Sequence, residues 1–556
     1  MFPWLSLILL VPGLAALGVL LVPAQRVNAI RGLALGAMLL ELALVLGLLV
    51  AYDPSRAGVN EPNAFQFVER LTLLELALGP WGRLRVDYYL GLDGLSLTLV
   101  VLTALISAIG VLSSWTIERG VKGYFALYLL LVAAMMGVFV ALDLFLFYVF
   151  WELMLIPMYF LIGLWGGERR AYAAVKFFLY TLAGSIFLLL VLIGLYFSSA
   201  LNPDAPPALQ VRTLDLLRLM RPEAYAPDAP FNPEAPGLIL GWNARLLAFL
   251  VLFVGFAIKL PAVPLHTWLP DAHVEAPTPI SVILAGVLLK MGGYGILRLG
   301  YGLFPEGGIA FGTGIAALGM LGVIYGALVA AAQEDLKKLI AYSSVSHMGY
   351  VLLGIASLTQ EGVAGAVFQM FTHGLVAAML FLLVGVLYDR VHDRMIGHFR
   401  GLSQLMPLYG GVALFAFLAS MGLPGLAGFV SEALVFLGVF SAESIHAGRA
   451  FSPVPRWMAL VSAAGIVLAA VYYLWAVVQR MFYGPLRLRE EAWRASLVDL
   501  NGRERAMFFP LMALVLLLGL YPQAYLGLIR ASTGRFLEWV LNSGTAWLQR
   551  GLALGN

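Results

Sequence analysis

Uninterrupted apolar runs of about 20 residues recur along this chain, and they constrain its fold more than any other feature. They extend from Leu5 to Ile529, and each is long enough to cross a hydrocarbon layer about 30 Å thick. In the whole chain 61% of the residues are hydrophobic and 12% are charged, which is about half the charged share of a soluble domain. Because the runs lack the alternating polarity of transmembrane β-strands, the sequence predicts an all-α polytopic membrane protein.

The apolar runs divide into about 14 predicted transmembrane segments. They lie near residues 3–22, 30–52, 90–116, 123–142, 143–165, 171–199, 243–271, 277–301, 307–330, 334–357, 362–388, 406–440, 456–484 and 505–530. An even number places both termini on one side of the membrane. The short loops of the opposite side are rich in Arg and Lys, as at Arg169, Arg170, Lys337 and Lys338, so that side is predicted to be cytoplasmic.

The parts of the chain outside the segments carry further expectations. The first segment has no basic residue before it and is read as a retained helix rather than a removed signal. Two long loops, 53–89 and 200–245, are expected to cover the outer face, and the second is too rich in proline to hold a long helix. The weakly amphipathic tail from Arg535 to Arg550 is expected to lie on the surface as a helix.

Composition also limits the chemistry of the chain. With 0 cysteines it cannot ligate an iron–sulfur cluster through thiolates or attach a c-type haem. We therefore expect no cofactor or metal in this chain. Its net charge of +3 includes no dense basic tract, so no nucleic-acid partner is expected.

Ionisable side chains within the apolar segments are the candidate functional residues. They are the bases Lys176, Lys259 and Lys290, which we expect to be the only Lys or Arg there, and mainly the acids Glu41, Glu152 and Glu432. A charge at the centre of a bilayer costs about 2.5–3.5 kcal/mol, so such residues usually face the bundle interior and mark a pathway. A proton path is therefore the first hypothesis.

Each candidate also has a structural interpretation. Lys176 is about one turn inside its segment and could extend its amine to the interface. Glu41 is the only charge of its segment, which is more typical of a structural or interface residue. His347 and His373 lie in the middle of their segments, where a hydrogen-bonded core histidine competes with a proton-carrying one.

Two segments are predicted to be broken beside a charge. Pro261 and Pro264 follow Lys259, and Pro424 with its neighbouring glycines precedes Glu432. Paired broken helices at corresponding positions are typical of transporters built from inverted repeats, although two ordinary proline kinks are the alternative. The predicted repeats are spans 4–8 and 9–13. The predicted domains are 1–122 (helices 1–3), 123–301 (first repeat), 307–484 (second repeat) and 485–556 (helix 14 and tail).

The sequence around these residues resembles a known family. The strings FWELMLIP at 150–157, HTWLPDAH at 266–273 and LKMGGYG at 289–295 are similar to the antiporter-like subunits of respiratory complex I and the Mrp cation/proton antiporters. The string GVLYDRVH at 385–392 and the glutamate at 432 resemble the M-type subunit of complex I in particular. In L-type and some Mrp chains the position that corresponds to Glu432 is usually lysine. The two long outer loops are longer than this resemblance leads one to expect.

The resemblance implies a function and a path. Glu152 would pair with Lys259, Lys290 would pass charge toward His347 and His373, and Glu432 would end the path. Lys176 and His266 are secondary candidates. NADH oxidation and quinone reduction would occur in other subunits, so this chain would be a proton-pumping module among membrane-arm partners, including L-type and N-type chains and small membrane subunits. It would reside in an energy-transducing membrane, such as a bacterial plasma membrane, with both termini outside.

Two other functions stay open from the sequence. A stand-alone Na⁺/H⁺ antiporter, or an Mrp-type antiporter subunit, would use the same Glu–Lys pair without redox drive. A b-type haem protein would need two histidines on neighbouring segments, which His347 and His373 provide.

Overall fold

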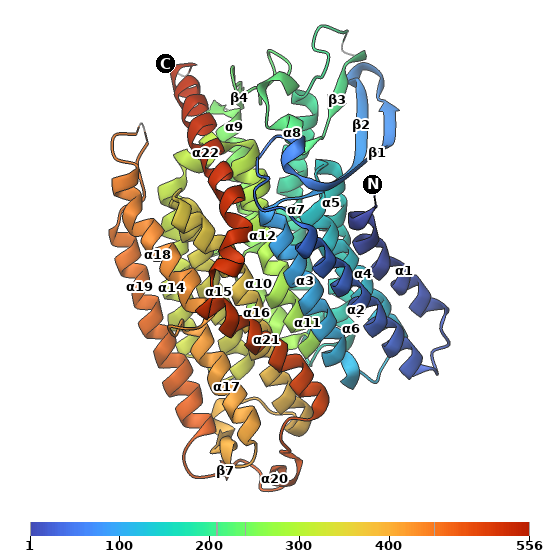
Figure 1. The fold of residues 1–556 in the computed structure, drawn as a ribbon, viewed down its shortest axis with the longest axis vertical. Coiled ribbons are helices and arrows are strands. Elements are labelled where there is room, and N and C mark those ends of the chain that lie inside the picture. The colour runs from blue at the N-terminus through green and yellow to red at the C-terminus, as the bar shows by residue number, and fades with distance from the viewer. Residues whose placement is uncertain (1, 207–208, 240, 450, 555–556) are drawn as a thin grey trace.

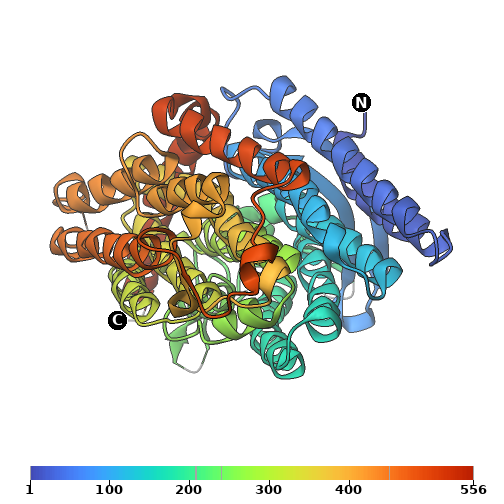
Figure 2. The same ribbon diagram turned by 90° about the horizontal axis from the view of Figure 1, so that it is seen from below.

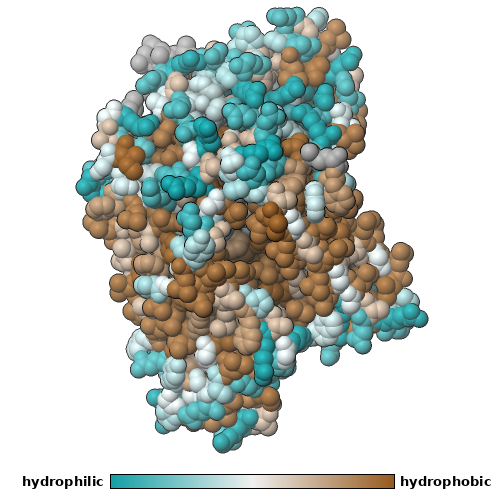
Figure 3. All heavy atoms as spheres, in the orientation of Figure 1, coloured by the Kyte–Doolittle hydropathy of each residue, from teal (hydrophilic) through white to brown (hydrophobic). Residues whose placement is uncertain are grey.

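An apolar band lies between two polar ends of the molecule, on the face seen in Figure 3. The structure is a computed structural model that describes residues 2–206, 209–239, 241–449 and 451–554. Nearly all of the band consists of long helices that run between the two ends (Figure 1). This arrangement is the one that a bilayer requires, because helices satisfy their own backbone hydrogen bonds in hydrocarbon.

The helices follow the predicted segments closely. In the first half they are α1 (Trp4–Leu21), α2 (Val27–Ala51), α3 (Gly94–Ser113), α4 (Val121–Val140), α5 (Leu144–Leu153), α6 (Leu155–Trp165), α7 (Arg170–Ser198), α8 (Leu216–Leu219), α9 (Ala244–Lys259), α10 (Trp268–Glu275), α11 (Thr278–Ile283) and α12 (Leu289–Gly295). In the second half they are α13 (Pro305–Ala310), α14 (Gly312–Ala331), α15 (Leu336–Ala356), α16 (Gln360–Val391), α17 (Pro407–Ser420), α18 (Ala427–Ile445), α19 (Trp457–Ala470), α20 (Trp493–Ser496), α21 (Gly502–Leu520) and α22 (Gln523–Leu554).

Within the described residues, 12 continuous helical stretches are long and apolar enough to cross a membrane. The other two predicted segments are helical but interrupted. Segment 243–271 consists of α9 and α10 with a break between them, and segment 505–530 falls on α21 and α22, which are bent by 70°. The all-α membrane fold is confirmed, and the difference in number arises where a helix is divided.

Both predicted breaks are present. The first lies between the end of α9 at Lys259 and the start of α10 at Trp268, and the second separates α17 from α18. In the second break Gly422 and Gly425 have φ of +75° and +94°, which side chains larger than glycine rarely adopt. The relation of the two halves as inverted repeats, and the domain limits drawn from it, stay predictions.

The two long loops form a small sheet that the sequence analysis did not predict. Strands β1 (Gln66–Ala77), β2 (Arg83–Leu92) and β3 (Val211–Thr213) lie in the order β1-β2-β3 at the upper end of Figure 1. Arg70 on β1 contacts Asp87 at 2.6 Å and Asp215 at 2.8 Å, which ties the first loop to the second. The expectation that 200–245 holds no long helix is confirmed for its described residues, where the one α-helix is the single turn α8.

Helix α16 lies in the buried centre of the bundle, where it packs against α3, α11, α15, α18 and α22. Seen from below, α1 and α2 lie at one edge, and α18 and α19 lie at the opposite edge (Figure 2). The predicted helix at Arg535–Arg550 is confirmed as the last part of α22, which packs against α13 and leaves Arg535, Glu538 and Arg550 exposed. Both termini lie toward the end that carries the sheet (Figure 1).

Candidate functional site

Lys290 lies on a short α-helix between two π-helical segments. These are η6 (Leu284–Leu288) and η7 (Ile296–Tyr301), and such wide turns are frequent at functional sites. The Lys290 side chain is fully buried, with 0% exposure. A Cβ atom on Gly292 would come within 2.6 Å of Leu260 N, so only glycine lets α12 approach the end of α9 this closely. Helix α12 is therefore seated against the first break.

Lys290 contacts the first of two neighbouring histidines. Its Nζ is 2.7 Å from Nδ1 of His373 on α16 and also donates to Ala285 O. The ring of His373 lies 5.3 Å, centroid to centroid, from the ring of His347 on α15. The two histidines therefore follow Lys290 in a fixed order, His373 first, which the sequence alone did not specify.

His347 leads to Glu432 on α18. The His347 Nδ1 atom is 3.4 Å from Glu432 Oε1, and Ser420 Oγ is 3.3 Å from the other ring nitrogen. Gln369 also approaches His347 Nδ1, at 3.3 Å. Beyond them, Glu432 Oε2 lies 2.6 Å from where Gly422 would carry a Cβ, so the glycine of the second break makes room for the carboxylate.

A small cavity of about 10 Å³ joins these groups. Its lining includes both histidines, Gln369, Ser420 and Glu432. This volume is about what one water molecule requires, and the lining offers enough polar partners for it. The proton-carrying groups thus lie in one line, here called the relay, which consists of Lys290, His373, His347 and Glu432.

The implied pair of Glu152 and Lys259 is not formed in this structure. Lys259 is 2% exposed, and its Nζ has no hydrogen-bond partner among the described residues. The ammonium instead lies 4.9 Å from the centroid of the Trp151 ring and 5.9 Å from that of Phe177. Oε1 of Glu152 on α5 is buried and also has no hydrogen bond among the described residues. The two side chains therefore form no direct ion pair here, because the Trp151 ring receives the ammonium, and the pairing that the resemblance implies stays a prediction.

The secondary candidates lie apart from the relay. Lys176 forms a partly exposed ion pair of 2.7 Å with Asp271 on α10. His266 lies in the first break, with its ring 5.2 Å from that of Tyr325 and its Nδ1 without a hydrogen bond among the described residues. Glu41 on α2 is 0% exposed, and neither carboxylate oxygen has a hydrogen bond within the described part of the chain.

The sequence analysis missed two buried arginines. Arg298 contacts Asp93 at 2.5 Å, and Arg245 contacts Glu306 at 2.5 Å, with every partner at most 4% exposed. The expectation that three lysines are the only basic residues in the segments is therefore wrong. The sequence did carry a signal for them, because Arg298 lies within the predicted segment 277–301 and Arg245 within 243–271.

The sequence analysis also left out His273. This histidine on α10 is 0% exposed, its ring stacks 4.4 Å from Phe381, and both nitrogens lack hydrogen bonds to described residues. A buried histidine whose two ring nitrogens have no described partner is a further proton-carrying candidate.

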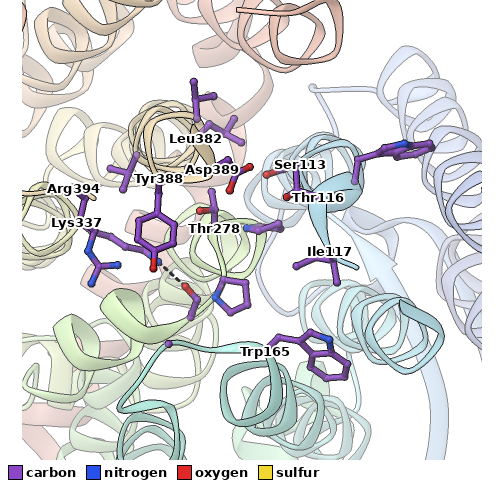
Figure 4. A pocket seen from close by; sticks show the side chains of 18 of the residues that line it. Ser113, Thr116, Ile117, Trp165, Thr278, Lys337, Leu382, Tyr388, Asp389 and Arg394 are labelled. Atoms are coloured by element: carbon purple, nitrogen blue, oxygen red, sulfur yellow. Dashed lines mark hydrogen bonds between the residues drawn. The ribbon is translucent and has the colours of Figure 1, made fainter. Parts of the chain in front are cut away.

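A cavity of about 730 Å³ opens at the end of the molecule opposite the sheet. Figure 4 shows Lys337, Tyr388, Asp389 and Arg394 around it, opposite Trp165. The Lys337 side chain is 4% exposed and donates to Ala276 O at 2.6 Å. The cavity therefore connects the polar groups at that end of the molecule with the end of α10, the helix that contains His273.

The haem alternative does not fit these histidines. Their ring centroids are only 5.3 Å apart, and the cavity between them measures about 10 Å³. One ring nitrogen of each histidine is already engaged, by Lys290 and by Glu432. A porphyrin cannot be placed between them without separating α15 from α16.

Comparisons with known proteins agree on one family. Residues 141–452 match the family described as NADH:quinone oxidoreductase/Mrp antiporter, TM. The chain is 42% identical over 545 residues to "NADH-quinone oxidoreductase subunit M" of Rhodobacter capsulatus, covering 96% of each chain. It is 39% identical to "NAD(P)H-quinone oxidoreductase chain 4 1" of Picosynechococcus sp., covering 94% of this chain and 89% of that one.

Solved structures give the same result. A chain of respiratory complex I from Thermus thermophilus with bound NADH superposes with a TM-score of 0.76 at 30% identity, covering 98% of this chain and 99% of that one. A chain of the Mrp complex from Dietzia sp. DQ12-45-1b reaches a TM-score of 0.75 at 21% identity, covering 97% and 100%. The second likeness is one of fold alone.

Proposed function

Because this chain belongs to the NADH:quinone oxidoreductase/Mrp antiporter transmembrane family, we propose that it is the M-type membrane subunit of an NADH:quinone oxidoreductase and that it translocates protons. The single observation that carries the proton role is the relay, in which Lys290, His373, His347 and Glu432 follow one another through the buried centre. The names of the relatives support the parent complex.

The relay groups can exchange protons without a redox centre. A proton leaving Lys290 passes along the 2.7 Å contact to Nδ1 of His373 when that nitrogen is unprotonated. The ring then releases its other proton toward His347, from which Glu432 accepts it. Each histidine is left with the proton on the nitrogen that received it, so its ring must turn, or exchange its tautomer through water in the small cavity, before the next proton is accepted.

Glu152 and Lys259 supply a switch in this proposal. An opposite charge nearby favours the ammonium, and burial disfavours it, so moving Glu152 toward or away from Lys259 changes how tightly the lysine holds its proton. The unpaired state seen here, with the ammonium over Trp151, is the one in which Lys259 releases a proton most readily. The closed pair would be the proton-holding state.

Proton uptake is assigned to the end opposite the sheet. The 730 Å³ cavity brings solvent-sized space to Lys337 and to Val274, the residue that follows His273 on α10. We assign His273 the transfer from this cavity to Lys290, since it is the buried ring with both nitrogens unengaged by described residues. Release then follows from Glu432 through the second break.

The magnitudes are adequate for pumping. Moving a charge against about 180 mV requires roughly 4 kcal/mol, which corresponds to a change of about 3 pKa units. Buried groups reach shifts of about 3–5 units when their surroundings change. The energy itself would come from NADH oxidation and quinone reduction in other subunits, with which L-type and N-type chains and small membrane subunits would form the membrane arm.

The position in the membrane belongs to the same proposal. In this proposal the end with the basic loops and the large cavity lies in the cytoplasm, and the sheet and both termini lie on the outer side of an energy-transducing membrane such as a bacterial plasma membrane. The Arg and Lys content of the short loops supports this orientation. Protons would then move from the cavity end toward the sheet end.

A direct test uses the assembled complex in proteoliposomes. Lys259→Ala is expected to leave assembly intact and to abolish most NADH-driven proton uptake, whereas Lys338→Ala, an exposed lysine of α15, should not. Near-normal pumping in Lys259→Ala would refute the switch. The second candidate, an Mrp-type Na⁺/H⁺ antiporter subunit, has the fold likeness to the Dietzia chain in its favour. Proton movement driven by a sodium gradient without NADH would support it.

A further inference from the structure

The strongest unassigned feature is a basic cleft at the end of the molecule opposite the sheet. It measures about 620 Å³ and lies between the lower end of η10 (Val471–Phe482), the chain at 396–400, and β7 (Arg487–Leu488), whose partner strand is β6 (Phe399–Arg400). Four arginines line it, namely Arg400, Arg480, Arg487 and Arg489. A second cavity of about 390 Å³ adjoins it and shares His398, Trp475 and Arg480.

The arginines are poorly neutralised by the chain itself. Arg400 and Arg487 stand opposite one another in the β6–β7 pair, and both are exposed. Neither of them, nor Arg480, forms an ion pair with a described residue, and Arg480 instead stacks 4.5 Å from the Trp475 ring. Among the described residues, Asp393 contacts His398 at 2.9 Å and Arg489 at 3.9 Å, and Glu334 lines the adjoining cavity, whereas no acid lines the main cleft itself. The cleft therefore carries an uncompensated positive charge.

Planar guanidinium groups of this kind suit a phosphate. They bind its oxygens through paired N–H donors, and their weak hydration makes the exchange of water for phosphate favourable. The volume falls within the range of about 300–1,000 Å³ that is usual for small-ligand sites. Charge and size therefore indicate a phosphate-bearing ligand.

Two apolar helix faces lead into the cleft from the membrane band. On α19 and η10, Val467, Val471 and Trp475 follow one another at four-residue spacing with exposures of 66%, 43% and 55%. On α14, Leu321 and Leu328 are 46% and 53% exposed, and this helix ends at the second cavity. Acyl chains can lie along these faces while the phosphate lies among the arginines. A free anion would make no use of the apolar faces.

We propose that this cleft binds an anionic glycerophospholipid, with its phosphate among Arg400, Arg480 and Arg487 and its acyl chains along the exposed faces of α19 and α14. Basic pockets at the cytoplasmic ends of transmembrane helices are a recurring site for such head groups. Trp475 is placed as an interfacial residue, with its ring between the apolar faces and the arginines. This assignment is independent of the proton path, which lies on other helices.

The test measures lipid binding by the purified complex. Delipidated complex in neutral detergent is titrated with dioleoylphosphatidylglycerol, dioleoylphosphatidylcholine or inorganic phosphate, and bound lipid is counted by native mass spectrometry. A photoactivatable phosphatidylglycerol then identifies the labelled peptide. We expect preferential retention of phosphatidylglycerol and labelling within residues 471–489.

Matched variants isolate the cleft. Arg400→Gln with Arg487→Gln should weaken the most tightly held phosphatidylglycerol by roughly 25-fold, at about fivefold per arginine. Arg26→Gln with Arg494→Gln removes two exposed charges from the same end and should change nothing. Arg400→Lys with Arg487→Lys should retain most of the binding if charge, rather than local folding, decides it.

Three results would overturn the proposal. Equal retention of phosphatidylcholine would remove the role of charge, and competition by inorganic phosphate at millimolar concentration would make the site one for a free anion. A photoactivatable lipid that labels no residue of 471–489 in the assembled complex would mean that another chain covers the cleft. Proton pumping is not a readout of this test, so its failure is separate from that of the relay.

Discussion

Replacing His373 by leucine removes the middle of the relay with little change in side-chain volume. In the structure the His373 ring fills the space between the Lys290 amine, 2.7 Å from its Nδ1, and the His347 ring, 5.3 Å away between centroids. Proton transfer between heavy atoms needs a separation of about 2.6–3.2 Å or one intervening water. The leucine side chain offers neither, so Lys290 and His347 would be separated by apolar atoms.

The expected size of the effect follows from these contacts. A positioned acid–base group contributes about 100-fold to 10,000-fold to proton transfer, so we expect pumping in His373→Leu to fall by at least about 100-fold. Lys290 would also lose a charge-assisted hydrogen bond, which is worth about 1.5–3 kcal/mol, so the variant should unfold at a lower temperature. The two effects are separable because the first concerns transport and the second stability.

The assay is the ratio of protons taken up to NADH oxidised in proteoliposomes, followed with a pH-sensitive dye. His446→Leu is the matched control, because His446 is 1% exposed and bonds the carbonyls of Ser357 and Leu358 rather than any relay group. It should lower stability similarly and leave the ratio unchanged. If His373→Leu pumps at the parent ratio, or if both variants lose pumping equally, the relay is not the path.

Three further predictions concern stability. Asp93→Asn leaves Arg298 buried without its anionic partner and should lower the free energy of unfolding in detergent by about 3–5 kcal/mol. A loss below about 1 kcal/mol would contradict the importance of this buried ion pair. Gly292→Ala places a Cβ 2.6 Å from the backbone of the first break and should cost about 1–3 kcal/mol, while Gly411→Ala, with nothing within 4 Å, should be nearly neutral. Burial raises the pKa of Asp143, which lies between α4 and α5, to about 7. The folded chain then binds this proton more tightly than the unfolded chain, so stability should be highest near about pH 4 and should fall as pH rises through about 7, a slope that Asp143→Asn reduces.

Much of the membrane architecture could be predicted from the sequence. The length of each apolar run was sufficient to place the helices, because hydrocarbon admits no other backbone arrangement over that distance. Both breaks could be predicted from three prolines, Pro261, Pro264 and Pro424. Proline has no backbone N–H, so it interrupts a helix at its own position in the sequence. The family could also be identified from the short motifs around Glu152 and Lys290.

The errors came from parts of the molecule that depend on distant neighbours. Strands β1 and β2 pair locally, but β2 gains its second partner β3 from a loop more than 100 residues later, a contact that no local pattern predicts. The helix at 535–550 was predicted, but its packing against α13 depends on contacts with residues far away in the sequence. Arg298 is tolerated in the bundle because Asp93, far away in the sequence, neutralises it.

The sequence by itself made four of the charges in the membrane conspicuous, namely Lys259, Lys290, Glu152 and Glu432, because burying any charge is costly. Only the tertiary structure decided how they connect. Lys290 meets His373, and His347 meets Glu432, through contacts between separate helices, whereas Lys259 turns from Glu152 to the Trp151 ring. Proton transfer depends on distances of about 3 Å, and such distances between helices are set by packing, which the order of residues along one helix does not specify.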